Sequence, residues 1–160
     1  ALVFGVITVA PARACNTAQP QGAAILVIEG LIESCGGTLD VKFDRAMLHK
    51  MPRKVINTQN PWVAGVNRYE GVLLRDILSA VHADGTVLTI SALDDFRADM
   101  TAEEVRTIDV ILADTFNGKD MDVRNKGPLF VIFPFTDEPS LAVERHLGQS
   151  VWQVNRITVK

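Results

Sequence analysis

From residue 25 onward, the most hydrophobic runs of this sequence are short and stand between turn-forming residues. Residues 25–28 form a run of apolar, mostly β-branched side chains that is soon followed by Gly30, and residues 39–43 alternate apolar with polar side chains. Residues 129–133 form an apolar run between two prolines. Runs of this length and composition are typical of strands rather than helices. The pattern therefore predicts a chain dominated by short strands.

The sequence Asn117-Gly118 is the strongest hairpin signal in the chain, because this dipeptide favours the tight turn that joins two antiparallel strands. It predicts a strand before it and a return arm over residues 119–123. The last predicted strand changes the phase of its alternation near Asn155, as a β-bulge would. The remaining strands are predicted at residues 54–58, 86–91, 110–115 and 151–159.

Helices are expected to be few and short. Asp44 can cap a helix over residues 45–50, residues 72–81 carry apolar side chains at helical spacing, and Thr101 with Glu104 forms a capping box for one or two turns. Residues 59–67, with a proline and a glycine, are predicted to form a loop. Because strands and helices do not alternate regularly, the fold class is α+β.

The length of 160 residues fits one domain, which we place at residues 22–160. The formal charge of −3, with no basic run, argues against a nucleic-acid partner. Residues 1–10 are almost all apolar and a small-x-small pattern follows, so residues 1–14 are interpreted as the remnant of a secretory signal peptide. A buried strand is the alternative. Cys15 and Cys35 could form a disulfide in an oxidising compartment or be unrelated thiols.

Two aromatic or acidic segments are candidate binding sites. Asp94-Asp95-Phe96 follows a predicted strand, and one carboxylate there could accept two neighbouring N–H groups of a heterocycle, although adjacent carboxylates in loops are usually solvated. Trp62 lies in the predicted loop, where it could stack on a flat ligand or cover the core.

A basic turn, Arg124-Asn125-Lys126-Gly127, precedes the run at residues 129–133. It is either a solvated turn or a loop that faces an anion or a ring, in which Gly127 would allow the backbone to come close. The three histidines are isolated from one another and from the cysteines, so no metal-ligand or catalytic motif is recognised.

Several segments together resemble the oxidoreductase molybdopterin-binding domain superfamily, to which the sulfite oxidases belong. The segments are residues 69–78 (YEGVLLRDIL), 91–96 (SALDDF), 110–113 with Asn117-Gly118, and 123–134 (VRNKGPLFVIFP). The resemblance covers residues 25–160. It implies the mixed α+β fold of that superfamily, with several small β-sheets and short helices.

The enzymes of this superfamily hold molybdenum with a cysteine four residues before a tryptophan. Compared with that pattern, Thr58 stands at the ligand position before Trp62, and a neutral hydroxyl is a weak donor where a thiolate is needed. Asn60 lies in the same segment and is a further candidate for ligand contact. Phe130 stands where the enzymes have an arginine that grips the phosphate of the cofactor.

The chain also resembles the stand-alone periplasmic pterin-binding proteins of the PruR type, which are small members of this superfamily. This resemblance implies an exported protein that binds a pterin non-covalently, does not catalyse a reaction, and relays pterin status to a membrane diguanylate cyclase/phosphodiesterase. In this hypothesis Thr58, Asn60, Trp62, Asp94, Asp95, Phe96, Arg124, Lys126 and Gly127 face the ligand. The alternatives are a molybdenum cofactor-dependent oxidoreductase, whose metal lacks a protein thiolate or takes Cys35, and an interaction module without a ligand.

Overall fold

In the computed structural model, residues 18–33 and 40–160 are described. The signal-peptide prediction for residues 1–14 and the question of a Cys15–Cys35 disulfide lie outside these residues. The described residues run from β1 to β10 and contain two mixed or antiparallel sheets with short helices, which confirms the α+β class. None of the helices in the described ranges is long and apolar enough to cross a membrane.

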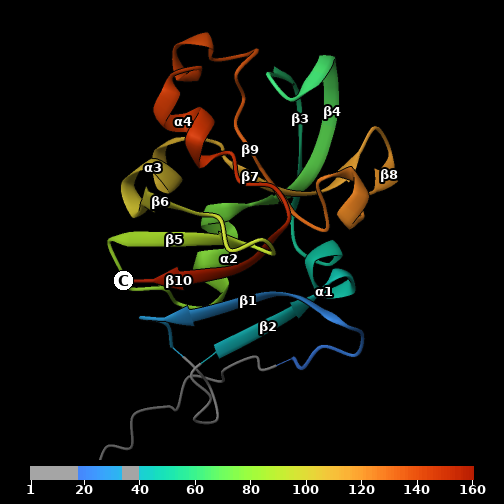
Figure 1. Ribbon diagram of the computed structural model, residues 1–160. Helices are drawn as coiled ribbons and strands as arrows, with labels where there is room; N and C mark the ends of the chain where they lie inside the picture. The colour runs from blue at the N-terminus through green and yellow to red at the C-terminus, as the bar shows by residue number, and fades with distance from the viewer. Residues whose placement is uncertain (1–17, 34–39) are drawn as a thin grey trace, which may run out of the picture.

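The first sheet has the strand order β2-β1-β10-β5-β6 and lies at the lower end of the molecule in Figure 1. β1 and β10 are parallel and every other pair in this sheet is antiparallel. The predicted bulge in the last strand is confirmed, because the register of β10 against β5 shifts between Val154 and Arg156. The strands are β1 (Ala24–Gly30), β2 (Asp40–Asp44), β5 (Val87–Ala92), β6 (Arg97–Thr101) and β10 (Val154–Val159).

The second sheet has the order β3-β4-β7-β8, and β9 pairs with β7. The predicted hairpin at Asn117-Gly118 is confirmed, with Phe116 opposite Lys119 and positive φ angles of 47° and 79° at the two turn residues, as a type I′ turn requires. Its return arm is shorter than predicted. The strands are β3 (Arg53–Asn60), β4 (Val63–Leu73), β7 (Ile111–Phe116), β8 (Lys119–Asp120) and β9 (Phe130–Ile132).

The prediction of a loop at residues 59–67 was wrong. β3 continues to Asn60 and β4 begins at Val63, so only Pro61 and Trp62 form the turn between them. Asn60 explains the difference, because its Oδ1 accepts hydrogen bonds from the backbone N–H groups of Trp62 and Val63, both at 3.1 Å. Asparagine side chains commonly stabilise turns by hydrogen bonds of this kind, so the chain can turn here without a glycine.

The helices are short and lie around the sheets. The predicted helix at residues 72–81 begins two residues later, because Val72 and Leu73 still pair with β7. The capping box of Thr101 and Glu104 is confirmed. β6 and the last helix were not predicted from the sequence. The helices are α1 (Arg45–His49), α2 (Leu74–Ala80), α3 (Ala102–Thr107), α4 (Glu144–Gln149), and the 3-10 turns η1 (Val123–Asn125) and η2 (Pro139–Leu141).

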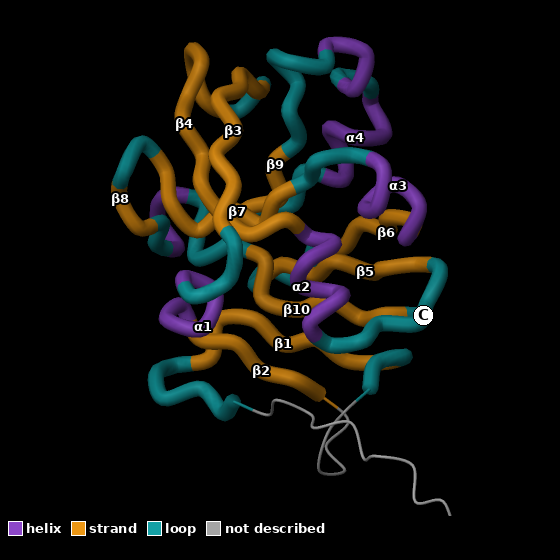
Figure 2. The backbone as a smooth tube through the Cα atoms, turned by 180° about the vertical axis from the view of Figure 1, so that it is seen from behind, coloured by secondary structure: helices purple, strands orange, loops and turns teal. Residues whose placement is uncertain are grey.

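The side chains form two apolar clusters. The larger one packs the first sheet against α1, α2, α3 and one face of the second sheet. The smaller one lies on the other face of the second sheet and contains Ile56, Tyr69, Ile111 and Phe130, with Trp62 and Trp152 partly buried against it. The turn between β3 and β4 and helix α4 lie at the same end of the molecule (Figures 1 and 2), next to this smaller cluster.

Candidate functional site

A cavity of about 240 Å³ lies beside the smaller cluster, and we call it the tryptophan cavity. Its walls come from the β3–β4 turn, the end of β5 with the following turn, α4, and the segment before β10. The lining is mostly apolar and includes Trp62, Asp94, Phe96, Leu147, Ser150 and Trp152. Three of the residues proposed from the sequence, Trp62, Asp94 and Phe96, are therefore brought together around one space.

Trp62 lies at the boundary between the smaller cluster and a cavity. Its ring makes T-shaped contacts with Phe130 and Trp152, with ring centroids 6.2 and 5.6 Å apart, so it covers part of the smaller cluster. The same side chain lines the tryptophan cavity. Edge-to-face contacts of this kind are a preferred arrangement of aromatic rings. Trp152 also lines the cavity, and the sequence analysis did not single it out.

The two neighbouring carboxylates, Asp94 and Asp95, differ in position. Asp94 lines the cavity, and its Oδ1 accepts a hydrogen bond of 3.1 Å from the N–H of Phe96, which fixes its orientation. Both residues are exposed, but Asp95 does not contribute to the lining. Phe96 lines the cavity while 52% of its surface remains exposed. An exposed aromatic ring beside an ordered carboxylate suits a ligand with a flat face and a polar edge.

Residues with positive φ angles lie next to residues that line the tryptophan cavity. Asp95, Lys126 and Gln153 have φ angles of 67°, 65° and 53°, a region that aspartate adopts more readily than lysine or glutamine. Lys126 and Gln153 are linked through the backbone, since the N–H of Gln153 donates to the carbonyl of Lys126. Such conformations persist where surrounding contacts fix them, and they concentrate at binding sites.

A larger groove of about 640 Å³ adjoins the cavity between the β3–β4 turn and α4. Trp62 and Leu147 line both spaces, and Asn60 and Thr136 line only the groove. The polar atoms of Asn60 are already used within the hairpin, since its Nδ2 donates to the hydroxyl of Tyr69 at 2.9 Å in addition to the turn contacts. The main role of the Asn60 side chain is therefore to hold the β3–β4 turn in place.

Thr58 does not face any of these spaces. It is 1% exposed, its hydroxyl donates to the carbonyl of Gln59 at 3.2 Å, and it accepts from the N–H of Thr136 at 3.2 Å. The hydroxyl thus joins β3 to the segment after β9. The sequence-based prediction that Thr58 contacts a ligand is therefore not supported. Its side chain points into the packed interior at this part of β3.

We expect Thr58→Val to reduce the free energy of unfolding by about 1 kcal/mol, because the N–H of Thr136 loses its acceptor. Urea denaturation measures this loss. The dissociation constant of any ligand of the tryptophan cavity should stay within about twofold of the native value, because Thr58 does not line this cavity. A large loss of affinity at unchanged stability would instead place Thr58 in contact with the ligand.

Arg124 and Lys126 line a different space, of about 230 Å³, which we call the basic hollow. It shares no lining residue with the tryptophan cavity. Lys126 connects the two, because its Nζ lies 4.6 Å from the ring centroid of Trp152. Gly127 is buried and does not line either space; a Cβ there would lie 2.7 Å from the carbonyl oxygen of Asp122, so its lack of a side chain serves packing within the turn.

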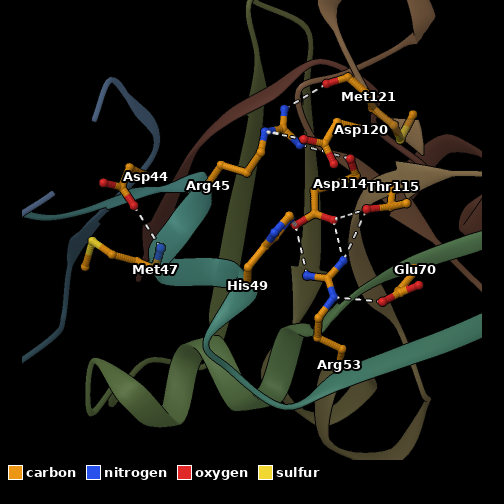
Figure 3. Close-up of polar contacts among 10 residues, drawn as sticks. All are labelled: Asp44, Arg45, Met47, His49, Arg53, Glu70, Asp114, Thr115, Asp120 and Met121. Atoms are coloured by element: carbon orange, nitrogen blue, oxygen red, sulfur yellow. Dashed lines mark hydrogen bonds and ion pairs between the residues drawn. The ribbon is translucent and has the colours of Figure 1, made fainter. Parts of the chain in front are cut away.

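A buried ionic network joins β3, β4, β7 and α1 (Figure 3), and the sequence analysis missed it. Asp114, which is fully buried, accepts hydrogen bonds from Arg53 at 2.6 and 3.1 Å and from the hydroxyl of Thr115 at 2.8 Å. Arg53 also donates to Glu70 at 3.0 Å. His49 Nε2 lies 3.3 Å from Asp114. The only sequence signal was an aspartate in an otherwise apolar strand.

Burial alone would raise the pKa of Asp114, but the hydrogen bonds from Arg53 and Thr115 and the proximity of His49 outweigh it, so the pKa lies below its usual value. The hydrogen bond to Asp114 also raises the pKa of Arg53. Both groups are therefore charged at neutral pH. The network ties three strands of the second sheet to one another and to α1, and none of its members lines the tryptophan cavity.

The two-sheet α+β architecture with short peripheral helices is that of the molybdopterin-binding domains. The family model described as "Oxidoreductase molybdopterin binding domain" matches residues 35–136, and the chain belongs to this family. The resemblance seen in the sequence is confirmed at this level.

Among solved structures, the fold is similar to that of the sulfane dehydrogenase SoxCD from Paracoccus pantotrophus. The TM-score is 0.63 at 21% sequence identity, with 84% of this chain and 37% of that chain covered. The chain therefore spans little more than a third of that protein, and the similarity at this identity concerns the fold. No match was found among curated proteins.

Proposed function

We propose that the protein binds a free pterin reversibly in the tryptophan cavity and does not catalyse a reaction. The observation that carries this proposal is the combination of two tryptophans and a phenylalanine with one ordered carboxylate, Asp94, around a single small space. Its volume of about 240 Å³ is below the range of about 300–1,000 Å³ that is typical of sites for drug-sized ligands. A single fused ring system suits that space.

A pterin meets the chemistry of these walls. It has a flat heteroaromatic face, for which Trp62, Trp152 and Phe96 offer aromatic surface. It also has an edge with two neighbouring N–H donors, like that of guanine, which a carboxylate can accept in a fork. Asp94 is the one carboxylate in the cavity lining, and it replaces the pair Asp94 and Asp95 of the sequence hypothesis.

The described residues do not fit the metal end of a molybdenum cofactor. The family pattern supplies a cysteine thiolate to the metal, whereas the lining of the tryptophan cavity has no thiol and the hydroxyl of Thr58 is buried and hydrogen-bonded within the protein. Within residues 18–33 and 40–160, no group of three or more His, Cys, Asp or Glu side chains could hold a metal ion. The aromatic side chains around the tryptophan cavity support a metal-free pterin as the ligand.

Export to the periplasm and a diguanylate cyclase partner belong to the same proposal. They are supported by the apolar segment at residues 1–10 and by the resemblance to periplasmic pterin-binding proteins. A pull-down with the periplasmic domain of a candidate cyclase, with and without pterin, tests the partner. Binding that is unaffected by the pterin would favour an interaction module without a ligand.

We expect Asp94→Asn to weaken pterin binding by about tenfold to a hundredfold, because hydrogen bonds to a charged group contribute about 1.5–3 kcal/mol. Asparagine keeps the oxygen that accepts from Phe96, so the turn is preserved. The only two tryptophans of the chain line the cavity, so the quenching of intrinsic fluorescence by oxidised and reduced pterins measures the affinity directly.

Asp95→Asn is the matched control, since it removes the neighbouring, exposed carboxylate and asparagine tolerates a positive φ angle. We expect its dissociation constant to stay within about twofold of the native value. Equal losses in both variants would point to a general electrostatic effect. Absence of quenching by the whole pterin panel would overturn the proposed function.

A further inference from the structure

The basic hollow lies on the opposite side of the smaller cluster from α4. Figures 1 and 2 show β8 and α4 on opposite sides of the strands β3, β4 and β9. The walls of the hollow are aromatic, with Tyr69 and Phe130 fully buried and Phe116 packed on Tyr69 at a centroid distance of 5.2 Å. Phe116 is the partly exposed ring of the three, so a flat, largely apolar body would contact the hollow through it.

The charged groups at this hollow are all cationic. Arg124 and Lys126 contribute to the lining, and no aspartate or glutamate does. Neither cation forms an ion pair with any residue in the described part of the chain. The nearby carboxylate of Asp122 accepts from the N–H of Asn125, so it caps the turn that carries the two cations. Two unpaired cations beside an apolar space favour an anionic ligand group.

From these observations we infer that the basic hollow is a second binding site, separate from the tryptophan cavity, for a small aromatic carboxylate. The ring packs against the partly exposed Phe116, and the carboxylate is paired with Arg124 and Lys126. An arginine guanidinium and a carboxylate can form two parallel hydrogen bonds, which adds direction to the charge attraction. Because Lys126 lies against Trp152, a wall of the tryptophan cavity, occupation of this hollow also affects the environment of that ring.

An NMR titration of nitrogen-labelled protein with benzoate tests this inference, with benzamide as the uncharged probe of the same shape. We expect saturable shifts at residues 124–126, Tyr69 and Phe116, with benzoate binding about tenfold more tightly than benzamide. The affinity for benzoate should fall as salt is added, because the site is partly exposed. Equal affinities for the two probes, or benzoate shifts confined to the tryptophan cavity, would overturn the inference.

Lys126→Met and Arg124→Gln should each weaken benzoate binding about threefold or more, since each removes one of the two charges. Lys119→Gln is the matched control: it removes an exposed lysine of β8 that does not line the hollow, and it should leave the affinity unchanged. Unchanged affinity in both test variants would contradict the site. Asp94→Asn should not affect benzoate, so failure of this inference and failure of the pterin proposal are distinguishable.

Discussion

Arg53→Met is expected to destabilise the protein by about 3–5 kcal/mol, because it leaves the buried carboxylate of Asp114 without its cation. Asp114 is fully buried, and methionine fills much of the space of the arginine side chain, so the lost charge rather than a cavity dominates the effect. Chemical denaturation at neutral pH measures the loss. Because most domains are stable by only about 5–15 kcal/mol, the variant should be near its folding limit.

The matched control is Arg68→Met, whose guanidinium pairs with Glu70 on the surface and is 45% exposed. Exposed pairs contribute little, so this variant should lose no more than about 1 kcal/mol. Adding Asp114→Asn to Arg53→Met should recover part of the loss, since the uncompensated charge is then removed. An Arg53→Met variant that is as stable as Arg68→Met would show that the network does not stabilise the fold.

The same pair predicts the pH dependence of the loss. In the native protein the pKa of Asp114 is lowered, so its contribution is fully present above the unfolded pKa of about 3.9 and is lost as the pH falls through the folded pKa. Without Arg53, burial should raise the pKa of Asp114, and the charged carboxylate then costs stability above that pKa. The difference between native protein and Arg53→Met should therefore narrow as the pH falls from 7 towards 4, as denaturation curves at several pH values would measure.

Phe130→Ala is the second variant with a large expected effect, again about 3–5 kcal/mol of unfolding free energy. Phe130 is fully buried in the smaller cluster, and its ring lies 6.2 Å from Trp62, 6.0 Å from Tyr69 and 6.3 Å from Trp152. Its removal leaves a cavity and also frees the two tryptophans that line the proposed pterin site. Pterin affinity should fall with stability, and calorimetric unfolding with fluorescence titration measures both.

Phe96→Ala separates the effect on pterin affinity from the effect on stability. Phe96 is half exposed, so its loss should change stability by no more than about 0.5 kcal/mol, while pterin affinity should fall because one aromatic wall is removed. If Phe96→Ala left pterin binding unchanged, that side of the tryptophan cavity would not contact the ligand. If Phe130→Ala were as stable as Phe96→Ala, the smaller cluster would not be a packed core.

Local signals in the sequence were sufficient for most of the elements. The type I′ turn at Asn117-Gly118, the capping box at Thr101 and the bulge after Val154 each depend on side chains or backbone preferences within a few residues. The prediction of a loop around Trp62 was wrong because it depended on composition. Composition does not reveal that the Asn60 side chain closes a two-residue turn.

The candidate site was only partly accessible to sequence reasoning. Trp62, Asp94 and Phe96 were singled out and do line one cavity, whereas Trp152 was overlooked and Arg124 and Lys126 proved to line another. Thr58 was identified by its spacing from Trp62, and its side chain turns into the packed interior. Spacing along the chain can match a residue to a position in a family pattern. It does not show on which side of a strand a cavity lies.

The sequence by itself determined the fold class, the hairpin and the family resemblance, because periodicity, turn chemistry and motif order are properties of neighbouring residues. Only the tertiary structure decided which carboxylate lines a cavity, that two separate spaces flank the aromatic cluster, and that Asp114 is balanced by Arg53. These features depend on contacts between residues about 60 or more positions apart in the chain, such as Arg53 with Asp114 and Trp62 with Trp152. Their energies arise from burial and from paired charges, which exist only once the chain has folded and brought these distant residues together.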